Sequence, residues 1–432
     1  MTLDLPAAQP PSRRVTERTG LAGLVLFAFG GFLNQGLFYS GLILMLLACL
    51  WQAVTFWPRV RHEPFFWVTL ALFGYVATSW LTAAWHYGPE WRPGILKYGA
   101  DLLISTGIFS LAAAFWMRGD PRRIRLVLVL ALASLTINLI IGFDWSELGA
   151  TLAGRRNHFG MGNGAPLYAA IGLTGIIVLL AHSRKRPECL IAVAAPLALL
   201  FSLVIFWSQT RAIWVASALV FPLLVLYLAW HHWRKGASTR KVAIATLAAA
   251  GILVVIGAMN SDIITKRLTQ HEMRLSGTGD TSWPLQTTDN STQLRLLMWQ
   301  EALIRIEEKP VIGWGAGSSS MLIQTSDVVP HRFRHFHNLY LQLLAELGII
   351  GMLLITSWVT LALKTALEKT QNHFEGGLRT FILSAMALFA LSGIFMIRHD
   401  DEYGQFFLIL IIALCVTGMF APENQASKSG DQ

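Results

Sequence analysis

A histidine stands where a basic, polar segment runs into an apolar helix. His337 lies in RFRHFHNLYLQLLAELGIIG, with two arginines before it and a hydrophobic run after it. Histidine is the side chain whose unperturbed pKa lies nearest neutrality, so it can move a proton at such a boundary. The preceding Arg332 and Arg334 could hold anionic groups of a substrate. This pattern indicates an enzyme that acts at a membrane surface on an anion linked to a lipid.

Four arginines elsewhere could bind phosphate, because a guanidinium presents a planar fork of donors to phosphate oxygens. Arg211 lies in the short turn SQTRAIW between two apolar runs, where a charge is costly unless it faces a cavity. Arg295 lies in the first turn of a predicted helix, where a cation becomes favourable when an anion also binds. Arg155 and Arg156, in AGRRNHFG, could bind a diphosphate or an acidic headgroup. The alternative for all four is contact with water or headgroups alone.

Five further polar residues could support this chemistry. They are Lys97, Asn338, Glu346, Asp400 and Asp401. Lys97 lies about one turn inside an apolar run, and Glu346 lies about 13 Å deeper than His337 along its helix, too far for direct contact. One of the two aspartates could orient His337 or pair with Arg211. The alternatives are a buried polar partner for Glu346 and a solvated turn for the aspartates.

No metal or cofactor is expected. His331, His335 and His337 lie close together, but an HxxxHxH run without nearby cysteines or paired carboxylates is a weak metal signal. The adjacent Asp400 and Asp401 would not chelate one ion well. The sequence also has no Walker loop, dinucleotide fingerprint or serine nucleophile elbow. If the protein transfers a sugar, the expected donor is therefore lipid-linked and not a nucleotide sugar.

The elements that would position these residues are membrane helices. Charged residues make up 14% of the chain and hydrophobic residues 54%, whereas soluble domains carry roughly 25% charged residues. Apolar runs of about 20 residues recur along the whole chain. They cover 19–35, 37–57, 64–85, 94–117, 124–143, 162–182, 187–207, 211–231, 241–259, 338–362, 379–397 and 405–421. The sequence predicts an all-α, polytopic membrane protein with about 12 transmembrane helices and one large, partly helical loop.

Lysines and arginines in the loops predict the orientation. With the N-terminus inside, the short inside segments hold about 20 of them, and the opposite face, apart from the long loop, about 6. Both termini are therefore expected in the cytoplasm. The expected divisions are helices one to nine over 1–259, a periplasmic loop over 260–337, helices ten to twelve over 338–421 and a cytoplasmic tail over 422–432. The scattered basic residues argue against nucleic-acid binding.

The long loop should contain amphipathic helices. A short one is predicted in ITKRLTQHEMRLSG. A longer one is predicted in LRLLMWQEALIRIEEKP, where Asn290-Ser291-Thr292 offers an N-cap before apolar residues at helical spacing and Pro310 ends the helix. Gly313, Gly315 and Gly317 follow and predict a tightly turned segment.

Three segments carry a resemblance to a known family. HNLYLQLLAELGIIG resembles the signature of the O-antigen ligase/polymerase superfamily, polytopic glycosyltransferases that use lipid carriers: a His-Asn or His-Ser start, then a glutamate and paired glycines. LRLLMWQEALIRIEEKPVIGWGAGS resembles the R…W…P…G.G block of that family, and SQTRAIW resembles its arginine-containing turn. The layout looks most like the ligase branch, because the loop over 143–161 is short and the chain ends soon after the last predicted span.

This resemblance implies an O-antigen ligase of lipopolysaccharide biosynthesis at the periplasmic face of the bacterial inner membrane. Its partners would be undecaprenyl diphosphate-linked O-antigen, a lipid A-core acceptor and membrane lipids, with no metal and no nucleic acid. His337 would be the general base that takes the proton from the acceptor hydroxyl. Arg211 and Arg295, with Arg155 and Arg156, would bind the diphosphate leaving group. A single displacement would invert the anomeric centre.

Other functions remain open at this point. An O-antigen polymerase or a protein O-oligosaccharyltransferase of the same superfamily would share the donor and differ in the acceptor. A transporter or flippase would carry ionisable residues near the middle of the membrane, and here Asp101 and Glu346 are the main candidates for such positions. A scaffold without catalysis gives no reason for His337 to occur with several arginines on one face.

Overall fold

The structure is a computed structural model of the 432-residue chain. It describes residues 11–182, 187–234, 291–330, 333–369, 377–399 and 401–421. All regular elements in these ranges are helices, so the predicted all-α class is confirmed there. Several predicted features lie outside the described residues, namely the span at 241–259, the short helix in ITKRLTQHEMRLSG, Asn290, His331, Arg332 and Asp400.

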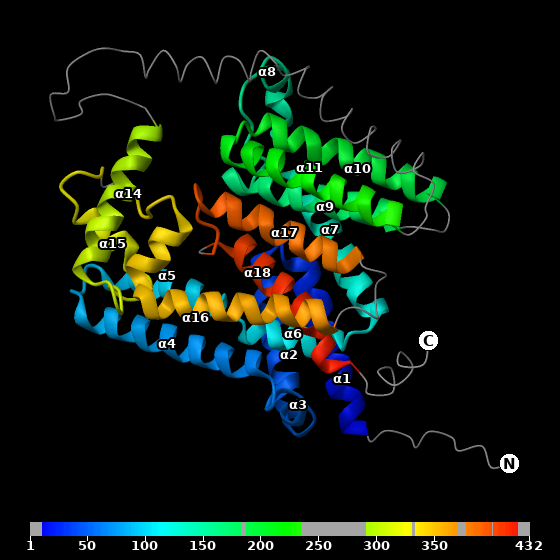
Figure 1. Ribbon diagram of the computed structural model, residues 1–432, viewed down its shortest axis with the longest axis horizontal. Helices are drawn as coiled ribbons and strands as arrows, with labels where there is room; N and C mark the ends of the chain where they lie inside the picture. Colours follow the sequence, from blue (N-terminus) through cyan, green and yellow to red (C-terminus); the bar gives the residue numbers. More distant parts are fainter. Residues whose placement is uncertain are drawn as a thin grey trace.

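Most helices belong to one bundle. They are α1 (Pro11–Gly30), α2 (Gln35–Trp51), α3 (Ala53–Val60), α4 (Pro64–His86), α5 (Arg92–Ile104), α6 (Ile108–Met117), α7 (Pro121–Ile141), α9 (Ala165–His182), α10 (Pro187–Trp207), α11 (Arg211–Arg234), α16 (Leu339–Lys369), α17 (Gly377–Gly393) and α18 (Glu402–Val416). The remaining elements are η1 (Trp145–Glu147), α8 (Leu148–Leu152), η2 (Gly162–Gly164), α14 (Ser291–Glu308), α15 (Ser319–Gln324) and η3 (Thr417–Phe420). Helices α4, α5 and α16 lie on one side of α18, and α9, α10 and α11 on the other (Figure 1).

Eight helices among the described residues are long and apolar enough to cross a membrane, and each coincides with a predicted run. The pair α2 and α3 makes a ninth if it forms one span, although the two helices are bent by 88°. Helix α17 is apolar but has only 17 residues. The structure therefore supports a polytopic membrane protein, but it does not confirm the predicted count of twelve spans.

Apolar side chains divide between the centre of the bundle and its outer surface. Phe406 on α18 packs against aromatic rings of the first two helices, including Phe27 at 5.0 Å and Phe38 at 6.1 Å between ring centroids. Large apolar residues such as Leu47 and Leu223 are instead exposed on the outer surface. An exposed apolar helix face of this kind suits contact with lipid.

The helix predicted in the long loop is α14, and it ends at Glu308, before Pro310 as expected. Met298 and Ala302 on one face are buried in a small hydrophobic cluster with α15 and Phe336. The amphipathic face of α14 therefore packs on the bundle. With α15, this helix covers one end of the molecule (Figure 1).

The glycine-rich loop after α14 docks into a break in α16. Gly348 has φ 61° and ψ −168°, which interrupts the helix and frees carbonyl groups in the preceding turn. The N–H of Trp314 donates to the carbonyl oxygen of Ala345 at 2.9 Å, and the N–H of Gly315 donates to that of Glu346 at 2.8 Å. The loop thus supplies hydrogen bonds that the break would otherwise leave unmade.

Glycine is required on both sides of this contact. A Cβ added at Gly313 would lie 2.4 Å from the carbonyl oxygen of Glu346, and one at Gly348 would lie 2.3 Å from that of Val311. Both glycines also have positive φ, 71° and 61°, which side chains with a Cβ rarely adopt. The two other glycines of the predicted tight segment have φ of 103° and 82°, so that prediction is confirmed.

Candidate active site

His337 is held in an unusual backbone conformation at the start of α16. Its φ is +54°, in the left-handed region that is uncommon for residues other than glycine. The next residue, Asn338, fixes the helix start, because its side-chain oxygen accepts hydrogen bonds from the N–H groups of Tyr340 (3.0 Å) and Leu341 (3.1 Å). Asn338 therefore positions His337 through the backbone. Strained residues of this kind occur often at functional sites.

The imidazole of His337 is surrounded by rings and cations. Its ring centroid lies 4.2 Å from that of His335 and 5.9 Å from that of Phe333. Burial, together with the charges of His335, Arg295 and Arg398, lowers the pKa of His337 to about 3. The imidazole is therefore neutral at physiological pH and carries a nitrogen lone pair that can accept a proton.

Two of the predicted arginines lie close to each other. Arg295 is the fifth residue of α14, and its pKa is lowered by burial and by the positive charge of Arg211. Arg211 is the first residue of α11 and is exposed to solvent. Two neighbouring cations repel each other, so this arrangement favours a bound anion.

Arg156 lies beside the same helix start. Its guanidinium donates hydrogen bonds to the side-chain oxygen of Asn163 and to Oγ1 of Thr210 (3.4 Å), the residue before Arg211. The side-chain amide of Gln209 donates to the carbonyl oxygen of Gly154 at 2.7 Å and fastens this loop to the α10–α11 turn. The structure therefore brings Arg156 and Arg211 together.

Arg155 points elsewhere. It forms an ion pair with Glu147 at 2.5 Å, and its side chain is 66% exposed. Exposed pairs of this kind contribute little binding energy. Of the two adjacent arginines, Arg156 is the one that the geometry assigns to the cluster.

Arg398 also belongs to this group, although the sequence did not single it out. It lies just before α18, and its charge is among those that lower the pKa of His337. One guanidinium nitrogen pairs with Asp401 at 2.7 Å, while its Nε is buried without a hydrogen-bond partner in the described part of the chain. Asp401 also accepts a hydrogen bond from the N–H of Gly404 (2.6 Å) and so caps α18. The sequence signal that could have pointed to Arg398 is its position just before the acidic start of a helix.

Glu346 holds a loop of the site in place. Its carboxylate is buried and accepts hydrogen bonds from the N–H groups of Gly317 (3.0 Å) and Ser319 (3.3 Å). It therefore holds the loop that leads into α15. This contact is the buried polar partner that the sequence left as an alternative for this residue.

Lys97 lies on α5 and lines a separate pocket beside Tyr98.

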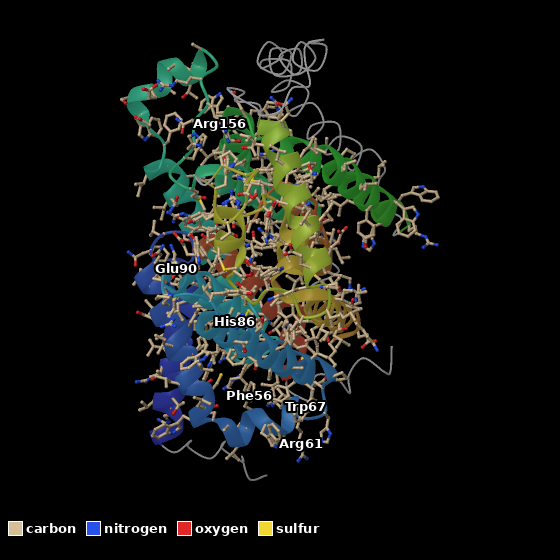
Figure 2. The ribbon with its side chains drawn as sticks, turned by 90° about the vertical axis from the view of Figure 1, so that its left-hand side faces the viewer. Phe56, Arg61, Trp67, His86, Glu90 and Arg156 are labelled. Atoms are coloured by element: carbon tan, nitrogen blue, oxygen red, sulfur yellow. The ribbon has the colours of Figure 1, made fainter. Side chains whose placement is uncertain are left out.

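Within the described residues, no group of three or more His, Cys, Asp or Glu side chains could hold a metal ion. The charges that act on His337 come from His335 and from the guanidiniums of Arg295 and Arg398. Figure 2 views the molecule from the side on which α14 and α15 lie. It shows Arg156 well apart from Glu90, which lies in the α4–α5 turn.

The central and late part of the chain, residues 196–356, matches the family model described as O-antigen ligase. This segment is similar to the O-antigen ligase family. The matched segment contains Arg211, Arg295, His337 and Glu346, whereas Arg156 and Arg398 lie outside it.

Curated proteins with related sequences agree with this family. The chain is 24% identical over 268 residues to a protein of Rickettsia felis named "Putative polysaccharide ligase", covering 59% of this chain and 58% of that protein. It is 25% identical over 249 residues to the "General O-oligosaccharyltransferase" of Acinetobacter baylyi, covering 54% of this chain and 41% of that protein. The chain thus spans less than two thirds of the length of each relative.

Proposed function

We propose that this protein is an O-antigen ligase, a glycosyltransferase that moves polysaccharide from undecaprenyl diphosphate to a sugar hydroxyl of the lipid A core. The observation that carries this proposal is a neutral, half-buried histidine near arginines that come from separate helices. The similarity of residues 196–356 to the O-antigen ligase family supports the same activity. The charge pattern of the loops supports a site facing the periplasm, in an inner-membrane protein with both termini in the cytoplasm.

The arginines bind the donor diphosphate in this proposal. Arg211, Arg295 and Arg156 are the principal contacts, and Arg398 is a fourth cation near His337. Negative charge builds up on the diphosphate as the bond to the sugar breaks, so guanidiniums that are already in place lower the barrier. They supply positive charge that a metal ion supplies in other transferases, and the reaction needs no metal.

His337 acts as the general base. Its neutral imidazole takes the proton of the acceptor hydroxyl while that oxygen forms a bond to the anomeric carbon. The carbon–oxygen bond to the diphosphate breaks, and its electron pair leaves with the phosphate. The resulting imidazolium then lies near the diphosphate anion, which stabilises it. One displacement of this kind inverts the anomeric centre.

A second candidate has a specific observation behind it. The relative in Acinetobacter baylyi is named a general O-oligosaccharyltransferase, and such an enzyme would use the same cations and base with a protein hydroxyl as acceptor. An O-antigen polymerase would use the same donor with a second lipid-linked glycan. The acceptor assay distinguishes these three activities.

The first test is transfer by the purified protein. Wild type and His337→Ala are incubated in EDTA with undecaprenyl diphosphate-linked glycan and rough lipopolysaccharide. His62→Ala, at an exposed position away from the site, is the matched histidine control. A ladder of glycan-capped lipopolysaccharide from wild type and His62→Ala, but not from His337→Ala, is expected.

Other outcomes would overturn the proposal in defined ways. Longer lipid-linked glycan without capping indicates a polymerase, and glycan on added acceptor protein indicates an oligosaccharyltransferase. Normal capping by His337→Ala removes that residue as the base. No change in either lipid with wild type rules out ligation and leaves transport as the activity to examine.

A further inference from the structure

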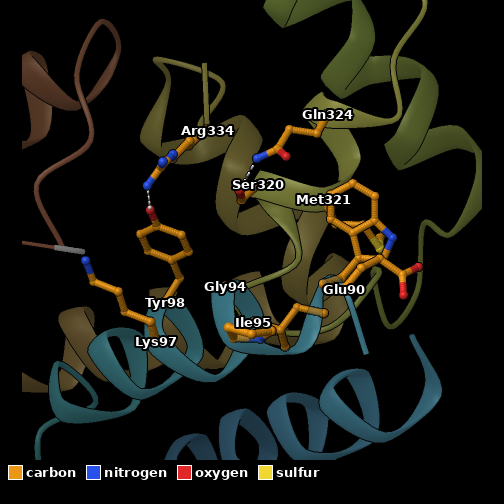
Figure 3. Close-up of a pocket in the computed structure, with 11 residues that line it drawn as sticks. Glu90, Gly94, Ile95, Lys97, Tyr98, Ser320, Met321, Gln324 and Arg334 are labelled. Carbon is orange, nitrogen blue, oxygen red and sulfur yellow. Dashed lines mark hydrogen bonds between the residues drawn. The ribbon is translucent and has the colours of Figure 1, made fainter. Parts of the chain in front are cut away.

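A pocket lies between α5 and α15. Its volume is about 290 Å³, and residues of the α4–α5 turn, α5, α15 and Arg334 line it. Figure 3 shows Lys97, Tyr98 and Arg334 at one side of this pocket and Glu90 at the other. None of the proposed diphosphate contacts lines it. The pocket is therefore separate from the proposed donor site.

We propose that this pocket binds a sugar of the acceptor that carries a phosphate or carboxylate group, next to the sugar whose hydroxyl is glycosylated. This inference rests on the proposed transferase function and assigns its acceptor subsite. The following observations concern the chemistry of the walls, the size of the pocket and its distance from His337.

The walls combine aromatic rings with polar groups. Trp91 and Tyr98 are half-buried, so each presents part of a ring to the pocket. The apolar C–H face of a sugar ring packs against such surfaces, while its hydroxyls need hydrogen-bonding side chains. Gln324 supplies one, and its amide donates to Oγ of Ser320 at 2.9 Å, which leaves the amide oxygen to accept from a ligand.

One end of the pocket is cationic. Nη1 of Arg334 donates a hydrogen bond to the Tyr98 hydroxyl at 3.5 Å, and Nζ of Lys97 lies 5.5 Å from the centroid of the Tyr98 ring. Both cations lie next to the Tyr98 ring, so both can contact one anionic substituent of a sugar that packs on that ring. Glu90 at the other side favours neutral hydroxyls there. The pocket thus suits a sugar with one charged end.

The size and position fit an acceptor better than a donor. Ligand sites usually enclose about 300–1,000 Å³, so this volume suits one or two sugar units and excludes a long polysaccharide. Arg334 precedes His337 by three residues, a distance of at most about 11 Å along the chain. In this proposal, the sugar next to the bound one reaches His337. The donor cations come instead from α11, α14 and the segments around them.

The test separates binding from transfer. Lys97→Gln/Arg334→Gln removes the charge at this end of the pocket, and Arg92→Gln, an exposed arginine on α5 that does not line the pocket, is the control. With a phosphorylated core oligosaccharide as acceptor, the double variant should raise the acceptor KM at least tenfold. The kcat and the donor KM should stay within twofold of wild type. With a dephosphorylated acceptor, wild type and double variant should be equal.

Binding is also measured without catalysis. The same phosphorylated oligosaccharide is titrated by calorimetry into His337→Ala, with and without the two pocket substitutions. At least tenfold weaker binding on substitution supports the subsite even if no transfer to lipopolysaccharide is found, so its test does not depend on that function. Equal binding, a raised donor KM, or an equal loss with the dephosphorylated acceptor would overturn the assignment.

Discussion

We expect kcat/KM for the donor to stay high in acid until the pH is far below the ordinary pKa of histidine. Burial, with the charges of His335, Arg295 and Arg398, lowers the pKa of His337 to about 3. At pH 5 a histidine with the usual pKa of about 6.5 is neutral in about 3% of molecules, whereas one with a pKa near 3 is neutral in about 99%. Because the base must be neutral, the two cases differ about 30-fold in kcat/KM for the donor.

The assay is the initial rate of transfer by purified protein between pH 8 and pH 5. The value of kcat/KM reports the pKa of the free enzyme, and kcat reports that of the substrate complex. We expect kcat/KM for the donor to change less than twofold. A diphosphate charge about 6 Å from the imidazole, at an effective dielectric constant of about 20, favours the protonated form by about 2.8 kcal/mol, or about two pKa units. The acid limb of kcat should therefore lie about two pH units above that of kcat/KM.

A control separates this effect from unfolding. The folded-state pKa of His337 lies below its unfolded value, so the unfolded state binds more protons between about pH 6.5 and pH 3, and stability falls as the pH falls through that window. Unfolding midpoints at each pH show whether the protein stays folded.

Arg295→Gln removes one cause of the lowered pKa of His337 and should move the acid limb of kcat/KM to higher pH. A tenfold fall in kcat/KM per pH unit below pH 6.5, with the protein still folded, would refute this account of the base.

Three further substitutions test the geometry, and two of them have a control variant. Arg156→Ala should reduce donor kcat/KM at least tenfold, since a charged hydrogen bond contributes about 1.5–3 kcal/mol, whereas Arg155→Ala should change it less than twofold; equal losses in a donor titration would contradict this difference. Glu346→Gln replaces one acceptor oxygen by a donor facing a backbone N–H, and should lower the unfolding free energy by about 1–3 kcal/mol. Gly348→Ala should lower the thermal unfolding midpoint in detergent, but Gly149→Ala, with open space around it, should not.

The membrane helices could be predicted because hydropathy is a local property. Every helix that passes the length and hydropathy criteria coincides with a run of apolar residues visible in the sequence. The helix α14 was also predictable, since apolar residues at helical spacing and Pro310 mark its course and its end. The span count was not fixed in the same way. The bend of 88° after Trp51 depends on packing that hydropathy does not report.

Parts of the site depend on tertiary structure and were not predictable. Arg155 and Arg156 are adjacent in sequence, yet one pairs with a surface carboxylate and the other reaches the α10–α11 turn. Arg398 gave only a weak local signal, because its relation to His337 arises when two distant segments meet. The function of Glu346 as an anchor for backbone N–H groups likewise requires the break in α16. Their roles in catalysis stay predictions until the variants are measured.

The cations of the site occupy a common kind of position. Arg211 is the first residue of α11, Arg295 lies within the first five residues of α14, and Arg398 precedes α18. His337 likewise precedes α16. A helix N-terminus carries partial positive charge, so a cation there is unfavourable by itself. The charge of Arg211 lowers the pKa of Arg295, and the charges of Arg295 and Arg398 lower the pKa of His337, so these groups lie near one another. A bound diphosphate would offset their repulsion together, which explains why the fold gathers them and why donor binding should precede proton transfer.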